Sequence, residues 1–316
     1  MMQDPVVHEY TQSKPPKWFT DGATGSQRFV LTLCGSVSLE PHILASKQLV
    51  ESKGCAIALG HYLSTDVAYD VEFDATSSVG WDIFQTLRQQ LLDIDIAVQP
   101  VSQRHKKLLI CDMDKTIVDA ETLDEVAAAV GIGSQVAAIT EQAMRGEIDF
   151  NTSLRHRVNL LKGRPEQIFT EMSNACRLNP GAETLLQKAK EAGIYAVLIS
   201  GGFDAIARPV AQRLGFDEVH SNRLEVENGR LTGDVIEPVI DASSKRELLL
   251  SIAEELNIGL DQCCAIGDGA NDIPMLEMAG LGIAYQGKPA TRAGTAYQIN
   301  MTSLKTALYF MGLQSD

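Results

Sequence analysis

The sequence predicts an α/β protein with a doubly wound parallel sheet and a helical cap insertion, preceded by a smaller α+β unit. Short apolar runs of the buried-strand type alternate with helical segments in the second part of the chain, at residues 107–111, 195–200, 263–266 and 282–285. More than 80 residues separate the first two runs, which is too much chain for one crossover helix. Before residue 102, strands and helices follow in a different order, so we expect separate units.

The first unit is predicted at residues 28–101, after a flexible extension at residues 1–27 where prolines stand among polar residues without periodicity. Its strands are expected at residues 29–33, 56–61, 68–73 and 94–98, and its helices at residues 43–52 and 79–91. This β-α-β-β-α-β order is that of the ferredoxin-like fold. The unit resembles ACT regulatory modules, but residues 34–38 lack the pattern that such modules often place after their first strand. Amino-acid binding and a packing or dimerisation role are therefore both open.

The second unit is predicted at residues 107–316, after a polar linker at residues 102–107. A helical cap at about residues 122–177 fills the gap between its first two strands. The pair Asn228-Gly229 stands between β-type residues and predicts a two-residue hairpin turn.

The composition excludes several classes of function. The chain has 316 residues, of which 45% are hydrophobic and 22% charged, as in ordinary globular proteins. Its net charge of −14 argues against a nucleic-acid partner, and no stretch approaches the roughly 20 apolar residues that span a bilayer. The N-terminus lacks the apolar region of a secretory signal, and the six cysteines form no C-x-x-C pair. We therefore expect a reduced, cytoplasmic protein with no membrane partner.

Polar residues follow three of the four predicted strands of the second unit. The runs are Asp112-Met113-Asp114-Lys115-Thr116, Ser200-Gly201-Gly202 and Gly267-Asp268-Gly269-Ala270-Asn271-Asp272. The carboxyl ends of parallel strands form the crevice in which ligands bind. These three clusters, distant in the sequence, should thus meet in one site.

The residue types of these clusters fit phosphoryl transfer. Asp112 and Asp268 supply the hard oxygen ligands that Mg²⁺ prefers, and Asp112 is the candidate nucleophile at a rigid strand end. Asp114 is suited to protonate the leaving oxygen and later to deprotonate water. Glycines beside Ser200 and Asp268 let N–H groups approach phosphoryl oxygens. One such motif is a weak signal, whereas the ordered combination is strong. For Asp272, a helix cap is an alternative.

Longer phrases between Lys107 and about Lys305 are similar to those of the haloacid dehalogenase superfamily. They are CDMDKT at residues 111–116, SLRHRV at 153–158, SGGF at 200–203, LTGD at 231–234 and GDGANDI at 267–273, together with Glu121 and Lys245. The resemblance implies that Asp112 is the nucleophile and Asp114 the general acid and base. It implies an Mg²⁺ ion held by Asp112, the Asp114 carbonyl and Asp268. It also implies that phosphate is held by Ser200, Gly201, Lys245 and Asn271, and the amino-acid end of the substrate by Glu121 and Arg157.

The chain most resembles superfamily members that hydrolyse phosphoserine. This implies conversion of O-phospho-L-serine to L-serine and phosphate, the last step of serine biosynthesis, with that small molecule as the partner and a homodimer through the first unit left open. One alternative is a related phosphatase or phosphotransferase that acts with another amino acid, such as homoserine. Another is a serine-sensing module without turnover, which the intact Asp112, Asp114 and Asp268 disfavour.

Some of these residues have a second interpretation. Lys115 stands where the superfamily usually has a small hydroxyl residue, and a long cation beside the phosphate would either strengthen substrate binding or fill space intended for the substrate. Met144 and Phe150 would either close a dry wall over the site or belong to a helix core. Arg157 could instead belong to a solvated basic face, and Lys245 to the surface.

Overall fold

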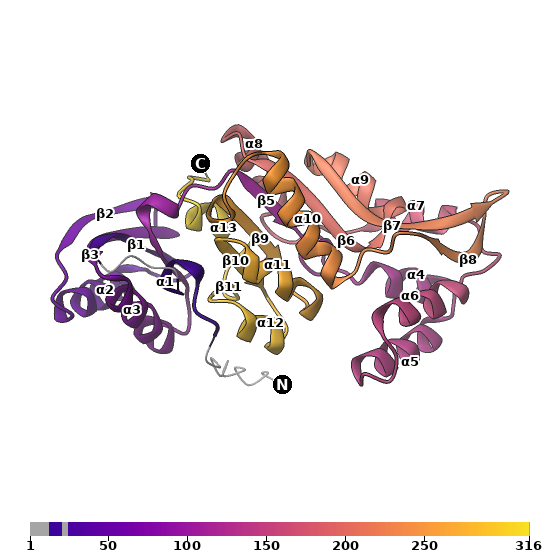
Figure 1. The fold of residues 1–316 in the computed structure, drawn as a ribbon, viewed down its shortest axis with the longest axis horizontal. Coiled ribbons are helices and arrows are strands. Elements are labelled where there is room, and N and C mark those ends of the chain that lie inside the picture. Colours follow the sequence, from indigo (N-terminus) through magenta and orange to yellow (C-terminus); the bar gives the residue numbers. More distant parts are fainter. Residues whose placement is uncertain (1–12, 21–24, 316) are drawn as a thin grey trace.

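The computed structural model describes residues 13–20 and 25–315 of the chain. Within these residues, no helix is long and apolar enough to cross a membrane. Two sheets organise the fold, one of four antiparallel strands and one of seven strands (Figure 1). The small sheet and the helical cap lie at opposite ends of the large sheet (Figure 1).

The first domain has the predicted β-α-β-β-α-β order. Its strands are β1 (Gln27–Cys34), β2 (Ile57–Ser64), β3 (Ala68–Ala75) and β4 (Asp95–Pro100), and its helices are α2 (Glu40–Ser52) and α3 (Ser77–Gln90). The strands pair in the order β2-β3-β1-β4, so β2 is an edge strand. Thr76 caps the start of helix α3 with a side chain that accepts a hydrogen bond from the Val79 N–H. The helix buries Ile83, Phe84 and Leu87 on one face. These elements confirm the ferredoxin-like prediction.

The second sheet has the order β11-β10-β9-β5-β6-β7-β8. Its strands are β5 (Leu108–Cys111), β6 (Tyr195–Phe203), β7 (Glu218–Glu227), β8 (Arg230–Ile236), β9 (Cys263–Gly267), β10 (Leu281–Tyr285) and β11 (Tyr297–Ile299). All neighbouring strands pair in parallel except β7 and β8. The central strand, β5, is buried along its whole length, which explains its continuous apolar sequence.

Helices cover both faces of this sheet. On β5, Leu108 and Ile110 belong to the core beneath α10 (Ala242–Glu255) and α11 (Ile273–Met278), which lie in front of the strands in Figure 1. The alternate residues Leu109 and Cys111 belong to the core that includes side chains of α8 (Ala182–Glu191), α9 (Asp204–Leu214) and α13 (Thr306–Phe310). The α/β doubly wound prediction is therefore confirmed.

The insertion between β5 and β6 is helical, as predicted. It contains α4 (Thr122–Ala129), α5 (Gly133–Met144), α6 (Phe150–Asn159) and α7 (Gln167–Ala175). The β7–β8 hairpin turns at Asn228 and Gly229, whose φ values of 51° and 74° fit the left-handed turn that the sequence predicts. The hairpin supports the cap through hydrogen bonds from Gly163 N–H to Leu231 O (2.8 Å) and from Leu231 N–H to Arg164 O (2.9 Å).

The segment predicted to be a polar linker is part of a packed interface instead. It overlaps the end of the 3-10 helix η1 (Val101–Gln103), and the side chains of Arg104 and Lys106 are buried. The Lys106 amine donates to the carbonyl of Asp261 (2.7 Å), and Arg104 donates to groups on both sides of the domain boundary. The linker prediction failed because charged residues that find buried partners look like solvated ones in sequence.

Part of the predicted flexible extension, at residues 1–12 and 21–24, lies outside the described residues. Residues 17–20 form the short helix α1 (Lys17–Thr20), and Trp18 is only 4% exposed. Its indole N–H donates to the Tyr297 hydroxyl (2.7 Å), which donates to Val98 O (2.9 Å). One aromatic side chain thus anchors this stretch across both domains, against the prediction for these residues.

Candidate active site

The three predicted polar clusters converge where β5, β6 and β9 end. These strands are neighbours in the sheet and run in parallel, so their carboxyl ends share one edge. A cavity of about 210 Å³ opens there. It is lined by Asp112, Asp114, Glu121, Phe150, Arg157, Gly201, Gly202, Asp268, Gly269, Asn271 and Lys288.

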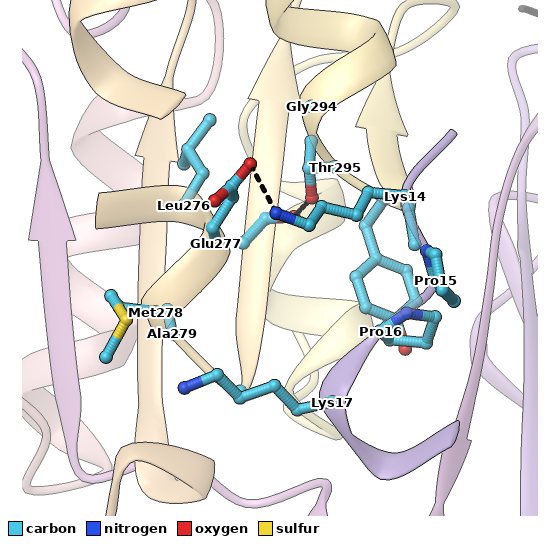
Figure 2. A pocket seen from close by; sticks show the side chains of 14 residues that line it. Lys14, Pro15, Pro16, Lys17, Leu276, Glu277, Met278, Ala279, Gly294 and Thr295 are labelled. Atoms are coloured by element: carbon cyan, nitrogen blue, oxygen red, sulfur yellow. Dashed lines mark hydrogen bonds and ion pairs between the residues drawn. The ribbon is translucent and has the colours of Figure 1, made fainter. Parts of the chain in front are cut away.

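Cavity size alone does not mark this site. A larger cavity, of about 400 Å³, lies between residues 14–17 and the segments around α11 and β11 (Figure 2). An ion pair between Lys14 and Glu277, 2.9 Å long, spans part of it. None of the predicted site residues lines it, so the chemistry of the lining residues, not volume, identifies the candidate site.

Asp112 lies directly after the central strand, and its N–H continues the ladder to Ile266 O (2.9 Å). Its carboxylate bonds the ammonium of Lys245, which also bonds Asp272 at 2.6 Å. Burial, followed by the charge of Asp272, raises the pKa of Asp112 well above its ordinary value. Burial alone would lower the pKa of Lys245, but the charges of Asp112 and Asp272 raise it. Lys245 is fully buried, so the alternative of a surface lysine is wrong.

Asp114 follows on a turn in which Lys115 adopts a left-handed φ of 57°. Burial, and then the charge of Glu121, raises the pKa of Asp114 to about 7. A Cβ atom on Gly202 would lie 3.2 Å from Asp114 Oδ2 and 3.0 Å from Ser200 Oγ. This crowding explains why the second loop needs glycine here. The Gly202 N–H donates to Ser200 Oγ (2.9 Å), which fixes the serine side chain.

Three aspartates form an acidic cluster, because one carboxylate oxygen from each of Asp112, Asp268 and Asp272 lies within 4.8 Å of the others. Asp272 Oδ2 accepts the N–H groups of Asp268 (3.1 Å) and Gly269 (2.9 Å), while its Oδ1 accepts from Lys245. Both Asp272 oxygens therefore organise the loop. Burial, and then the Asp272 charge, raises the pKa of Asp268 to about 6.

The cap supplies two charged residues. Glu121, at the start of α4, lies 3.4 Å from the amine of Lys288. Arg157 projects from α6 into the cavity, and burial lowers its pKa while Asp124 and Glu121 oppose that shift. Arg157 is half-buried and lines the cavity, which argues against the alternative of a solvated basic face.

Two expectations for the cavity wall have different outcomes. Phe150 lines the cavity, and its ring lies 3.5 Å from the position of a Cβ on Gly201, but Met144 is 81% exposed and is not part of the lining. Lys115 does not line the cavity either, since its amine pairs with Asp119 at 3.3 Å. The position of this amine therefore supports neither of the two effects considered for Lys115.

Sequence reasoning missed three residues around this site. Lys288 lines the cavity, and its N–H donates to Asp268 O (3.0 Å). Asn222 donates to Gly201 O (2.8 Å) and accepts from the Ile240 N–H (2.7 Å), and Asn179 bonds the turn after Asp114. None belongs to a motif; only the lysine-proline pair that opens α12 (Pro289–Gly294) gave a local signal.

The fold and this arrangement of carboxylates define a class of protein. The sequence pattern of the haloacid dehalogenase-like hydrolases matches residues 109–277. A structure of a hydrolase of this family from Salmonella enterica serovar Typhi superposes with a TM-score of 0.80 at 30% identity, covering 90% of this chain and 98% of that one. The chain belongs to the haloacid dehalogenase-like hydrolases.

Within the family, the similar curated proteins are phosphoserine phosphatases. The one from Vibrio cholerae is 34% identical over 286 residues, which cover 84% of each chain. The one from Archaeoglobus fulgidus is 41% identical over 222 residues, which cover 69% of this chain and 64% of the relative. Two further relatives are matched over 54% and 55% of their lengths, so the chain spans little more than half of some relatives.

Proposed function

We propose that this protein is a phosphoserine phosphatase, which hydrolyses O-phospho-L-serine to L-serine and phosphate in the last step of serine biosynthesis. The observation that carries the proposal is one cavity lined by Asp112, Asp114 and Gly201 together with Glu121 and Arg157. The relatives named phosphoserine phosphatase support the same substrate.

The donor set fits a magnesium ion. Asp112 and Asp268 are buried carboxylates whose pKa values are raised by burial and by the charge of Asp272, while both oxygens of Asp272 already accept hydrogen bonds. Asp112, the Asp114 carbonyl and Asp268 would hold the ion. When bound, Mg²⁺ reduces the repulsion between the phosphate and the attacking carboxylate and polarises the phosphoryl oxygens.

The chemistry then belongs to two aspartates. An Asp112 oxygen forms a bond to phosphorus while the bond from phosphorus to the serine Oγ breaks, which leaves an aspartyl phosphate. Asp114 gives its proton to the departing oxygen, and a pKa near 7 lets it carry that proton near neutral pH. It then takes a proton from the water that attacks the aspartyl phosphate, which releases phosphate and restores Asp112.

The other predicted residues would bind the two ends of the substrate. Lys245 already bonds the nucleophile and would also hold the phosphoryl oxygens. It would do so together with Ser200 and the Gly201 N–H near the end of β6 and with Asn271 from the loop after β9. The planar guanidinium of Arg157 would form a bidentate ion pair with the substrate carboxylate, and the carboxylate of Glu121 would pair with the substrate ammonium.

We also propose the domain boundaries, quaternary contact and location that the sequence predicts. A first domain at residues 28–101 and a phosphatase domain from residue 107, with a cap at about 122–177, are supported by the two sheets. The edge strand β2 exposes Leu59 and Tyr62 and supports a homodimer through the first domain. The six free, buried cysteines support a cytoplasmic location.

The test is phosphate release from phosphoserine, phosphothreonine and p-nitrophenyl phosphate by the full chain, with Mg²⁺ and with a chelator. We expect phosphoserine to give the highest kcat/KM and the chelator to stop turnover. Mg²⁺-dependent release from the aryl phosphate together with no release from phosphoserine would refute the proposed substrate while leaving the family assignment intact.

A further inference from the structure

Asn179 is a buried asparagine between the last cap helix, α7, and α8, and it is 7% exposed. Its side-chain amide donates two hydrogen bonds to consecutive carbonyls of the catalytic turn, Lys115 O (3.0 Å) and Thr116 O (2.8 Å). Its own N–H donates to Ile117 O (2.9 Å). One residue therefore bonds three successive carbonyls of the chain that follows Asp114.

These bonds join the two connections of the cap. The chain enters the cap through residues 117–121 and leaves it through residues 176–179. Val118 and Leu178 form an antiparallel bridge, and the Asp119 N–H donates to Arg177 O (2.9 Å). Asn179 adds a side-chain contact where this pair of connections meets the turn. The attachment of the cap and the position of Asp114 are thus parts of one hydrogen-bonded unit.

The turn needs such support because its backbone is strained. Lys115 has a φ of 57°, a region that costs a non-glycine residue about 1 to 3 kcal/mol. Within the turn, the Lys115 N–H donates to Ala120 O (3.1 Å), and the Ile117 N–H donates to Met113 O (2.8 Å). Asn179 is the partner that holds the Lys115 and Thr116 carbonyls from outside the turn.

Asp114 depends on this turn for its placement. Its Oδ1 is buried and makes no hydrogen bond of standard geometry among the described residues, although Thr122 lies close enough to the carboxylate to lower its pKa. We propose that Asn179 is a positioning residue for proton transfer, because it holds the turn in the conformation that aims Asp114 at the leaving oxygen. The proposal rests on the proposed phosphatase function.

The test uses the need of the leaving group for a proton. The serine oxygen needs a proton in order to leave, whereas p-nitrophenolate leaves as a stable anion. The value of kcat/KM reports the steps up to the departure of the leaving group. For Asn179→Leu we expect kcat/KM to fall about 10-fold to 100-fold with phosphoserine, and by less than about 3-fold with p-nitrophenyl phosphate. Asn179→Ala, which introduces no added bulk, should show the same selectivity if the leucine variant does not fold.

Asn222 provides the matched control. It is also a buried asparagine that clamps a loop of the site, but it bonds the carbonyl of Gly201 on the phosphate side. Asn222→Leu should therefore reduce kcat/KM by the same factor with both substrates. Circular dichroism and thermal unfolding of each variant show whether it is folded.

Equal losses with both substrates in a folded Asn179 variant, or no loss with phosphoserine, would overturn the positioning role. If the wild-type protein hydrolysed p-nitrophenyl phosphate but not phosphoserine, the proposed substrate would be wrong. The positioning role would then be judged with phenyl phosphate, whose poorer leaving group also requires a proton, and the same selective loss would support it.

Discussion

Arg104 and Asp70 form a bidentate ion pair at the boundary between the two domains. Nη1 of Arg104 lies 2.6 Å from one carboxylate oxygen of Asp70, and Nη2 lies 2.9 Å from the other. Nη2 also donates to Thr32 Oγ1 (3.1 Å) on β1 and to Tyr309 O (2.8 Å) on α13. A single guanidinium thus satisfies groups of the small sheet and of the last described helix.

Removing the carboxylate of this pair should destabilise the whole protein. Asp70→Ala leaves the Arg104 charge buried without its partner, which costs about 3 to 5 kcal/mol. Equilibrium unfolding in urea measures the change. As a control, Asp74→Ala removes one of the two acidic partners of the exposed Arg28 and should change stability far less. Equal effects of the two substitutions would contradict the importance of the buried pair.

Deletion of the first domain should not leave a soluble enzyme. A continuous apolar core runs from Phe29 and Trp81 to Tyr297 and Phe310, so a chain that begins at Gln103 exposes the second half of that core. We expect aggregation, measured by size-exclusion chromatography and light scattering. A monodisperse truncated protein with wild-type kcat would show that the two domains pack less intimately than the structure indicates.

Asp112→Asn should abolish phosphate release and the covalent labelling of the protein by phosphoserine, because it removes the attacking oxygen. Rapid acid quench followed by mass spectrometry detects the labelled aspartate. Asp119→Asn, a change at an exposed residue of the same loop, should leave both signals in place. Phosphate trapped on a residue other than Asp112 would refute the assignment of the nucleophile.

Arg157→Ala should weaken the use of phosphoserine far more than that of p-nitrophenyl phosphate. Loss of a charge-assisted, bidentate contact costs about 1.5 to 3 kcal/mol of binding free energy. This corresponds to a decrease of about 10-fold to 150-fold in kcat/KM for the substrate that uses the contact. Its neighbour Arg155, which pairs with Glu237 on the surface, is the control. The same loss with both substrates would move Arg157 from recognition of the amino acid to binding of phosphate.

Removal of the metal should stop turnover and be reversed by added Mg²⁺. Asp268→Asn replaces an anionic ligand by a neutral one, so we expect the Mg²⁺ concentration for half-maximal activity to rise about 10-fold or more. Titration calorimetry with Mg²⁺ checks binding independently of activity. An unchanged Mg²⁺ requirement in this variant would exclude Asp268 as a ligand.

Sequence patterns were sufficient where local chemistry determines structure. The short apolar run before Asp112 is typical of a buried strand, and the pair Asn228-Gly229 favours a hairpin turn, so these elements were predicted from a few residues. The same holds for the convergence of polar clusters at strand ends, which follows from parallel pairing.

Other features depend on partners that are remote in sequence. Arg104 is buried because it meets Asp70 and Tyr309, and Trp18 because it meets Tyr297. Asn179 contacts a turn 63 or 64 residues earlier in the chain. No periodicity or motif carries such information, because the burial of a polar side chain is decided by the groups that tertiary packing brings to it.

The position of α13 has a consequence for biosynthesis. The small sheet is complete once Pro100 has been made, but the helix that meets Gln99 and Arg104 through its carbonyls follows about 200 residues later. At roughly 5 to 20 residues per second, ribosomes need roughly 10 to 40 s to make that stretch. During this interval Gln99, Arg104 and the flanking apolar side chains lack their partners from α13, so the nascent first domain presents them to solvent and to chaperones.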